Sequence, residues 1–400
     1  MEQNRLIYIG TGNAKSPFIG KIRINTDWNT IQDNEILFIN DNFIERLASV
    51  NNLEWKYIIL WHQAQNFIEK DLLSNNLMWV NYFYPTNDIS FLEEWDIVEI
   101  QPAQTNQRLM ILYRIGTDDN LMIPTNDCNS SCIMCPLPLS HNKSDWLSLK
   151  KIERILSLMD KTTKHLSISW WEPTLLKQDF IKILSLCKSY IPNTSISILS
   201  NGRTFSYSSL VDAINSVWIK NIDFCIPLHA HIAEIHDGIT KVKWSFDQTI
   251  QGIKNLLSKW QNIELRIVIQ KDNYMFLEDI ADFIWDNFNG LYRVSFIGME
   301  FLWSAIINKD RVWVPYSDFK HNMQNAIMKL LKKKIWAYVF NVPLCFVDPP
   351  FRDFCLQSIS KYKIKYFNVC DECIMRSSCW WVFQSSYYML EKENIIPIKD

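Results

Sequence analysis

The sequence predicts an α/β protein built around a partial (βα)6 TIM-like barrel, with a β-rich domain before it and a small cysteine-rich domain after it. Three observations support this fold class. Short apolar runs alternate with longer amphipathic stretches over residues 116–305. Short apolar runs without such stretches fill residues 1–115, and a separate group of cysteines lies within residues 306–400. Alternation of the first kind is typical of parallel βα units.

The middle segment is expected to form six βα units, with the active residues at the carboxyl ends of the strands. Each expected strand is a short apolar run, and each expected helix is a longer amphipathic stretch. The expected strands are 121–125, 165–169, 195–200, 221–227, 263–270 and 292–298, and the expected helices are 148–161, 176–189, 208–216, 246–259 and 277–287.

The N-terminal segment is predicted to be β-rich because polar clusters of Asn, Asp and Gly separate its short apolar runs. No chemical motif is visible there, so we interpret it as an accessory or substrate-docking domain. Its expected strands are 6–9, 18–24, 35–39, 57–60, 96–100 and 108–115.

The bulk composition argues against several function classes. The chain has 400 residues and a formal net charge of −2, so it shows no electrostatic footprint for nucleic acid or an anionic membrane. The N-terminus lacks the pattern of a secretion signal, and no apolar run of about 18 residues could span a bilayer. We therefore expect a cytoplasmic protein. In that reducing compartment its ten cysteines are expected to be metal ligands or catalytic groups rather than disulfides.

The glycine and tryptophan contents are abnormal, with only 9 Gly but 17 Trp. A chain of this length would carry about 28 glycines at the usual frequency of roughly 7%. Several tryptophans occupy glycine-like places: Trp95 lies in an expected turn, Trp170 and Trp171 follow a strand, and Trp380 and Trp381 follow a cysteine. Turns and close backbone approaches favour glycine because it lacks a Cβ atom.

Two explanations of this composition are open. In the first, the gene comes from an organism that reads UGA as glycine, and the sequence has been translated with UGA as tryptophan. In the second, the chain is rich in tryptophan. UGG codons at positions 170, 171, 380 and 381 would exclude the first explanation. The residues that it would make glycine are Trp95, Trp170, Trp171, Trp244, Trp303, Trp336, Trp380 and Trp381.

The first chemical motif is the triplet Cys128, Cys132 and Cys135, spaced C-x3-C-x2-C directly after the first expected barrel strand. Soft thiolates favour an iron–sulfur cluster or zinc. Three thiolates leave one iron of a four-iron cluster without a protein ligand, and that iron can bind a small molecule. The alternative is a zinc site that borrows a distant fourth ligand, because structural zinc usually takes four protein ligands.

The candidate cofactor-binding residues share one property, which is that each lies at or just after the end of an expected barrel strand. The alternatives without a cofactor are a buried aromatic pair for the two tryptophans and an ordinary turn for Ser-Asn-Gly. The candidates are Trp170, Trp171, Glu172 and Pro173 after the second strand, Ser200, Asn201 and Gly202 at the third, and Glu300 after the sixth.

Three histidines, His229, His231 and His236, follow the fourth expected strand. They could suggest a metal site, but histidines in loops near a barrel mouth are more often neutral hydrogen-bonding groups. The pair His236-Asp237 on its own is usually a capping or surface pair.

A second cysteine group, Cys370-x2-Cys373-x5-Cys379, lies near the C-terminus, with Cys345 as a plausible fourth thiolate. Four sulfurs can complete a closed cluster site. A structural zinc with four cysteines is the alternative, because the ligand count suits it equally. Cys355 is a spare candidate ligand, whereas Cys187 and Cys225 are expected to be core residues.

These segments resemble the radical SAM (S-adenosylmethionine) enzymes, and in particular the C-type radical SAM maturase of His-Xaa-Ser repeat systems (HxsC-like). The triplet matches the superfamily signature. Residues 169–174 resemble its G-G-E-P segment, and residues 236–253 resemble a stretch of the peptide-modifying members, with Trp170, Trp171 and Trp244 where those patterns have glycine. The likeness is clearest from about residue 95 to residue 386. It is carried by TNDCNSSCIMCP (125–136), SNGRTF (200–205), IPLHAHIAEIHD (226–237), FIGMEFLWSA (296–305), VFNVPLC (339–345) and CDECIMRSSCWWVFQSS (370–386).

The resemblance implies an enzyme that modifies a small ribosomally made peptide with His-Xaa-Ser repeats, beside a partner radical SAM maturase. Cys128, Cys132 and Cys135 would hold a [4Fe–4S] cluster whose open iron binds SAM. An electron from a reductant such as ferredoxin or flavodoxin would cleave SAM, and the 5′-deoxyadenosyl radical would abstract a substrate hydrogen. The C-terminal cysteines resemble the SPASM or twitch type of auxiliary domain, which implies a second [4Fe–4S] cluster.

Two other readings compete with this one. The chain could be a radical SAM enzyme of another substrate class, such as cofactor biosynthesis. It could instead be a non-catalytic iron–sulfur or zinc protein whose SAM site is filled by Trp170 and Trp171. A neighbouring gene for a short peptide rich in His-x-Ser would favour the maturase, and a SAM-cleavage assay would separate enzyme from scaffold.

Overall fold

The computed structural model describes residues 7–12, 17–24, 35–39, 57–60, 81–85, 92–102, 107–118, 120–137, 147–357, 363–379, 382–390, 393 and 395–399. The chain divides into two compact units. Unit 1 contains Met1–Met122, Leu147–Leu166 and Ser185–Thr194, and unit 2 contains Ile123–Trp146, Ser167–Leu184 and Ser195–Asp400. The expected division into domains 1–115, 116–305 and 306–400 stays a prediction, since most of its second and third parts fall in one unit here.

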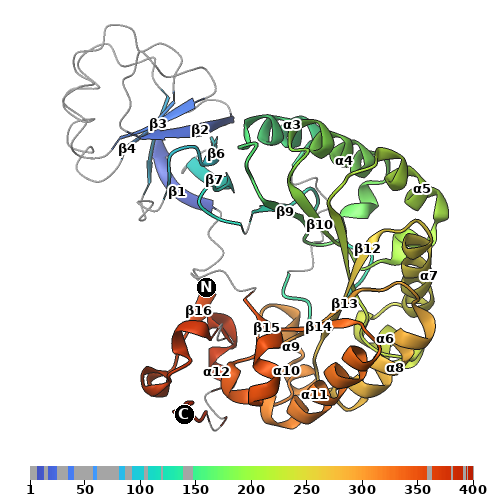
Figure 1. Ribbon diagram of the computed structural model, residues 1–400. Coiled ribbons are helices and arrows are strands. Elements are labelled where there is room, and N and C mark those ends of the chain that lie inside the picture. Colours follow the sequence, from blue (N-terminus) through green and yellow to red (C-terminus); the bar gives the residue numbers. More distant parts are fainter. Residues whose placement is uncertain are drawn as a thin grey trace, which may run out of the picture. The chain divides into compact units, whose positions relative to one another are not determined.

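The N-terminal strands form a closed barrel, which confirms the expected β-rich region (Figure 1). Strands β2 to β5 pair in parallel, whereas β1, β6 and β7 pair antiparallel with their neighbours. The order around the barrel is β1-β5-β4-β3-β2-β6-β7. The bounds are β1 Ile7–Gly12, β2 Phe18–Ile24, β3 Glu35–Ile39, β4 Tyr57–Leu60, β5 Asn81–Pro85, β6 Ile97–Gln101 and β7 Gln107–Tyr113.

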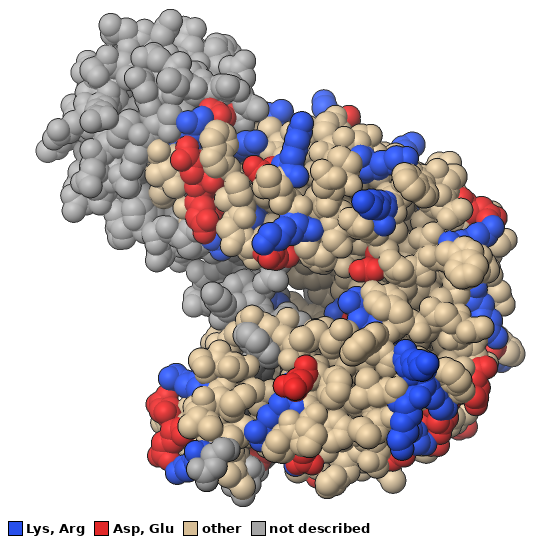
Figure 2. Space-filling view, viewed as in Figure 1, with Lys and Arg blue, Asp and Glu red and all other residues tan. Residues whose placement is uncertain are grey.

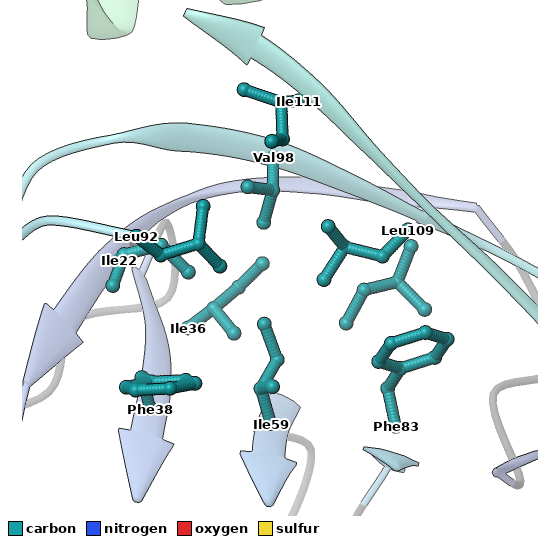
Figure 3. Packing of buried hydrophobic residues seen from close by; sticks show 10 residues of the cluster. Ile22, Ile36, Phe38, Ile59, Phe83, Leu92, Val98, Leu109 and Ile111 are labelled. Carbon is teal, nitrogen blue, oxygen red and sulfur yellow. The ribbon is translucent and has the colours of Figure 1, made fainter. Parts of the chain in front are cut away.

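Apolar side chains from these strands meet inside the N-terminal barrel (Figure 3). Ile22, Ile36, Ile59, Phe83 and Val98 are all fully buried there. Close-packed branched and aromatic side chains stabilise such a barrel through the burial of apolar surface. The labelled cluster is apolar throughout, in keeping with the lack of a chemical motif in this part of the sequence.

The second sheet has eight strands in the order β15-β14-β13-β12-β11-β10-β9-β8, and its neighbours from β10 to β15 are parallel. The order follows the sequence, as expected for successive βα units in a partial barrel. The six expected strands are confirmed, and β14 and β15 extend the sheet. The bounds are β8 Leu121–Met122, β9 His165–Ile168, β10 Ser195–Leu199, β11 Ile222–Pro227, β12 Asn262–Val268, β13 Arg293–Ile297, β14 Trp336–Phe340 and β15 Cys355–Leu356.

Amphipathic helices follow these strands and lie on the outer side of the curved sheet (Figure 1). The five expected helices are present as α3 Leu149–Leu158, α4 Gln178–Tyr190, α5 Ser208–Val217, α7 Ser245–Ser258 and α8 Leu277–Asn287. The sequence had not indicated α6 or the long α11. The remaining helices are α6 Ala233–Thr240, α9 Ser304–Ile307, α10 Lys309–Val312, α11 Tyr316–Lys332 and α12 Tyr387–Leu390.

Alternation along the strands separates two faces of this sheet. On β12, Ile263, Leu265 and Ile267 are buried apolar residues, whereas Glu264 and Arg266 project from the other face. Glu264 accepts hydrogen bonds from Arg266 Nε at 3.0 Å and Arg293 Nη2 at 2.5 Å. The two guanidinium groups keep the pKa of Glu264 low although burial acts to raise it. A charged group therefore lies on the face of β12 and β13 opposite these apolar residues.

The C-terminal segment consists mainly of short 3-10 helices and a small antiparallel pair, β16 Ile364–Lys365 with β17 Val382–Phe383. The 3-10 helices η7 Leu344–Phe346, η10 Asn368–Glu372 and η11 Arg376–Ser378 each lie next to or contain cysteines of the second group. Short turns of this kind bring residues distant in sequence together without a long regular element.

Seven tryptophans have backbone φ angles in the left-handed region, out of eleven such non-glycine residues that the structure describes. A β-carbon costs roughly 1–2 kcal/mol in left-handed helical backbone, and glycine avoids this cost. Trp336 is different, since it lies in β14. Trp380 and Trp381 lie outside the described residues. The seven are Trp95 (φ 78°), Trp170 (70°), Trp171 (49°), Trp218 (53°), Trp244 (69°), Trp260 (58°) and Trp303 (43°).

Trp260 shows the geometry most clearly, at the end of α7. Its N–H donates to Leu257 O at 3.0 Å, and the next N–H, of Gln261, donates to Leu256 O at 3.2 Å. These two bonds define a Schellman motif, whose left-handed position is usually glycine. The indole of Trp260 is 94% exposed, so packing of the ring does not compensate for the backbone conformation. Trp218 ends α5 with the same left-handed backbone.

No helix in the described part of the chain is long and apolar enough to cross a membrane. On the face shown in Figure 2, acidic and basic side chains are interspersed among the described residues rather than gathered by sign.

Candidate metal centre and cofactor site

The cysteine triplet lies in the loop that follows β8, where the sequence had placed it. Cys128, Cys132 and Cys135 are half-buried free thiols. Burial, followed by the nearby charge of Glu172 and the neighbouring Cys135, raises the pKa of Cys128 to about 12. Burial also raises the pKa of Cys132, to which the neighbouring Cys135 and Cys128 add. The thiols are therefore neutral until a metal binds and displaces their protons.

Backbone hydrogen bonds hold this loop against the end of α6. Ser131 N–H donates to Thr240 O at 3.0 Å, and Ile133 N–H donates to Ile239 O at 3.0 Å. Asn308 Nδ2, just before α10, donates to Ile133 O at 3.0 Å. Because the bonds alternate along the loop, they fix its path on both sides of Cys132, and Ile133 is buried beneath it.

Glu172 connects the second and third strand ends of the barrel. Its backbone N–H donates to Asp127 O at 2.9 Å, next to Cys128. Its buried carboxylate accepts from Ser200 Oγ at 2.8 Å and from Asn201 N–H at 2.7 Å. Burial raises the pKa of Glu172, although the hydrogen bonds act in the opposite direction. Glu172 thus positions the loops at both strand ends relative to the cysteine loop.

Trp170 and Trp171 precede Glu172 with φ angles of 70° and 49°. Two consecutive left-handed residues form a backbone that glycine adopts readily and tryptophan does not. The indoles meet edge-on with ring centroids 5.9 Å apart. Pro173 then begins the 3-10 helix η4 (Pro173–Leu176), for which Glu172 supplies the cap by accepting from Thr174 N–H at 3.2 Å. Positions 170 and 171 therefore have φ angles that are typical of glycine.

The turn after β10 requires two glycines. Gly202 has a φ of +80°, and its N–H donates to Ser200 Oγ at 3.1 Å. A Cβ atom on Gly252 of α7 would lie 2.2 Å from Gly202 O, so α7 approaches this turn more closely than any side chain permits. Asn201 O accepts from Thr249 Oγ1 at 3.1 Å, which ties the same turn to α7.

Two of the three histidines, His229 and His236, are buried beside each other, whereas His231 is half-buried. His229 N–H donates to His236 Nδ1 at 3.3 Å. Burial lowers the pKa of His229 well below its usual value and that of His236 to about 4. Asp237 caps α7 by accepting from Trp244 N–H at 2.6 Å and Phe246 N–H at 2.8 Å. These bonds make His236-Asp237 a structural pair at the base of α6 and α7.

Glu300 follows β13 and lies 3.6 Å from Lys363 Nζ. Burial raises the pKa of Glu300, and the lysine charge opposes that shift. The described partner of Glu300 is therefore a residue of the C-terminal segment, and a contact between Glu300 and a cofactor stays a prediction.

The second cysteine group comes together in three dimensions. Burial, together with the neighbouring Cys379, Cys370 and Cys373, raises the pKa of Cys345 to about 12, so all four thiols lie within electrostatic reach. Cys379 Sγ accepts from Leu344 N–H at 3.5 Å. The spare candidate Cys355 also lies near Cys379.

The remaining cysteines are core residues, as the sequence predicts: Cys187 and Cys225 are buried. In the conformation that the described residues adopt, no three His, Cys, Asp or Glu side chains are arranged to hold a metal ion. The donor chemistry of the first loop still fits an iron–sulfur cluster, because three soft thiols share one short, firmly held segment. The four C-terminal thiols are equally soft donors, but they come from two segments, one at Cys345 and the other from Cys370 to Cys379.

Residues 122–284 match the family model described as Radical SAM superfamily. No curated protein matches the chain. Among solved structures, the chain is similar to Streptococcus suis SuiB bound to precursor peptide SuiA, at 18% identity over 55% of this chain and 48% of that chain, with a TM-score of 0.44. It is also similar to anSMEcpe with bound AdoMet (14% identity, 55% and 60% covered, TM-score 0.43).

A third similar structure is a radical SAM methyltransferase from Sphaerobacter thermophilus, at 11% identity over 61% of this chain and 69% of that chain, with a TM-score of 0.41. The matched part spans about half the length of the SuiB chain.

Proposed function

We propose that this chain, which carries a radical SAM domain over residues 122–284, is a radical SAM enzyme that reductively cleaves SAM. One observation carries the proposal most directly. Three thiols on one loop, Cys128, Cys132 and Cys135, lie at the end of the first barrel strand, and backbone bonds from α6 and from Glu172 hold that loop. Three soft ligands leave one site open on a four-iron cluster.

Each part of the site has a definite task in this proposal. When bound, a [4Fe–4S] cluster at the triplet supplies the electron and the open iron for SAM cleavage. The backbone of residues 170–172 would bind the amino group of SAM. Glu172 holds that backbone in place through its hydrogen bonds with Asn201 N–H and Asp127 O. The inner face of the barrel orients the substrate and excludes water.

Binding of SAM further requires room at the loop of Trp170 and Trp171. We propose that both positions are glycine in the living protein, through reading of UGA as glycine. The φ angles of 70° and 49° support this proposal, because they are those of a glycine pair. Trp218 and Trp260, which the sequence alone did not single out, join the same set through their left-handed backbone.

The substrate proposed for this site is a small peptide with His-Xaa-Ser repeats, modified beside a partner radical SAM maturase in the cytoplasm. The sequence segments over 226–253 and the C-terminal cysteines support the peptide class. A second [4Fe–4S] cluster on Cys345, Cys370, Cys373 and Cys379 would accept an electron from the substrate or help to bind the peptide. Ferredoxin or flavodoxin would supply the electron for SAM cleavage.

The test is SAM cleavage after anaerobic reconstitution with iron and sulfide. The chain with Gly at 170 and 171 is expected to release 5′-deoxyadenosine when reduced. Cys132→Ala should abolish release, whereas Cys187→Ala, which removes a buried thiol from the core of α4, should keep it. If the glycine form binds a cluster but releases no 5′-deoxyadenosine, the proposed enzyme activity is contradicted. The remaining explanation is then a non-catalytic metal-binding protein.

A radical SAM enzyme of another substrate class is the second candidate, because the first cluster and the SAM site would be the same. Co-expression with a His-Xaa-Ser peptide separates the two. A mass change in the peptide that depends on Cys132 supports the maturase, and SAM cleavage without any change in the peptide supports the alternative.

A further inference from the structure

Arg203 is a positively charged residue beside the cysteine loop that the sequence patterns did not single out. It begins the 3-10 helix η5 (Arg203–Ser206), directly after Gly202. Its Nη1 donates to Asn129 O and, at 3.2 Å, to Ser130 Oγ. Both acceptors lie between Cys128 and Cys132. The guanidinium therefore contacts the segment that joins two cluster ligands.

Two further contacts fix the orientation of this guanidinium. Arg203 Nε donates to Gln248 Oε1 of α7 at 2.8 Å, and Arg203 N–H donates to Asn201 Oδ1 at 3.1 Å. Asn201 Nδ2 in turn donates to Asn129 Oδ1 at 2.6 Å. The turn after β10 therefore contacts Asn129 through the side chains of Asn201 and Arg203. Gln248 of α7 holds the arginine through its hydrogen bond with Nε.

The arginine charge also acts on the site. The guanidinium contacts the segment between Cys128 and Cys132 directly, and its charge disfavours protonation of the buried His236. Three thiolates make a bound cluster anionic, and one-electron reduction adds another negative charge. A nearby cation stabilises the reduced form more than the oxidised form, because net charge helps to set the potential of such clusters.

We propose that Arg203 is a positioning residue for the first cluster, which holds residues 129–130 in place and makes the cluster easier to reduce. This inference rests on the proposed cluster at the triplet but not on SAM cleavage or on the identity of the peptide. Loss of a hydrogen bond that orients a metal-binding segment commonly reduces metal affinity by roughly 10- to 100-fold.

The experiment compares Arg203→Gln, Arg203→Lys and Arg311→Gln after reconstitution, all in a chain with Cys370→Ala and Cys373→Ala so that the second cysteine group contributes less signal. Lys keeps the charge but loses the forked geometry, and Gln loses the charge. Arg311 is the matched control, because it bonds to Asp272 and Gly238 O but not to residues 127–133. The readouts are the rate of iron loss to a chelator and the midpoint potential of the cluster from an EPR-monitored titration.

Arg203→Gln is expected to lose iron roughly 10- to 100-fold faster than the parent and to show a more negative potential. Arg203→Lys should also lose iron faster, but its potential should stay closer to that of the parent. Arg311→Gln should match the parent in both. Arg203→Gln with the iron loss and the potential of the parent would overturn the proposal. A parent chain that binds no iron would overturn both this proposal and the proposed cluster.

Discussion

At the residue scale, the two cysteine groups are expected to divide the work. Cys132 lies in the loop that would hold the cluster next to SAM, whereas Cys373 lies in the separate C-terminal group. Cys132→Ala should abolish 5′-deoxyadenosine release because the first cluster loses a third of its ligands. Cys373→Ala should keep that release but block formation of the modified peptide. Chromatography of the nucleoside and mass spectrometry of the peptide measure the two steps, and identical behaviour of the variants would contradict the division.

The second prediction at the residue scale concerns the buried carboxylate of Glu172. Glu172→Gln leaves only one acceptor oxygen for the donors Ser200 Oγ, Asn201 N–H and Thr174 N–H. An unpaired buried donor costs roughly 1–3 kcal/mol, so the variant should unfold at lower denaturant concentration. The variant should also bind SAM more weakly, because the loop of residues 170–172 is no longer held in place by the Glu172 carboxylate.

The matched control for Glu172 is Glu153→Gln, since Glu153 lies on the outer helix α3 and only accepts a long bond from Tyr190 Oη at 3.3 Å. Its stability and SAM affinity should equal those of the parent. Equal SAM affinity in Glu172→Gln and the parent, measured by calorimetry, would show that Glu172 does not position the loop.

At the element scale, helix ends and helix interiors should respond oppositely to glycine. Trp260→Gly removes a β-carbon from the left-handed position after α7 and should stabilise the chain by about 1 kcal/mol. Trp285→Gly places glycine inside α8 and should destabilise it by about 1 kcal/mol, and it also loses the contact of Lys333 with the indole. Denaturant unfolding measures both changes. Destabilisation by Trp260→Gly would contradict the assignment of that position.

The start of α11 should give stability a dependence on pH. Both carboxylate oxygens of Glu393 accept from Tyr316 N–H, at 3.1 and 3.2 Å. Burial raises the pKa of Glu393 to about 7, and the charge of Asp318 contributes to that rise. The raised pKa means that the folded chain holds the proton more tightly than the unfolded chain. Stability should therefore be greatest below the usual pKa of glutamate and fall as pH rises towards 7.

Glu393→Gln tests this dependence, because it keeps a neutral side chain at every pH. Relative to the parent, the variant should gain about 1 kcal/mol between pH 4.5 and pH 8, after allowance for solvent around the half-buried carboxyl group. Free energies of unfolding at several pH values provide the measurement. A difference between the two proteins that stays constant with pH would exclude the raised pKa.

At the scale of the whole molecule, periodicity was enough to predict the six central strands, five of the outer helices and the β-rich N-terminal part. Those elements follow from local alternation of apolar and polar residues. Helical periodicity is also present in α11, where Tyr316, Phe319, Met323, Ile327 and Leu330 are buried at spacings of three and four residues, so this helix could have been predicted. β14 and β15 belong to the sheet through pairing between segments that are distant in sequence. The long-range contacts that define them are not visible in the local sequence.

The candidate site shows the same limit. The triplet was visible because its three ligands are close in sequence. Arg203 was not, because its role depends on contacts with Asn129 and Gln248 from separate elements. Trp218 and Trp260 also needed the backbone angles, since each follows a helix without a motif. For Trp336 the structure gives no reason for glycine, because the residue lies in an ordinary strand.

The proposed SAM site lies where the backbone of residues 170 and 171 turns, so the proposed function depends on the loop between β9 and Glu172. The most direct measurement is tandem mass spectrometry of the peptide spanning residues 165–177 from the protein made in its native host. We expect glycine at both positions, in agreement with φ angles of 70° and 49°. Tryptophan at both positions would contradict the account and leave the three cysteines without room for SAM beside them.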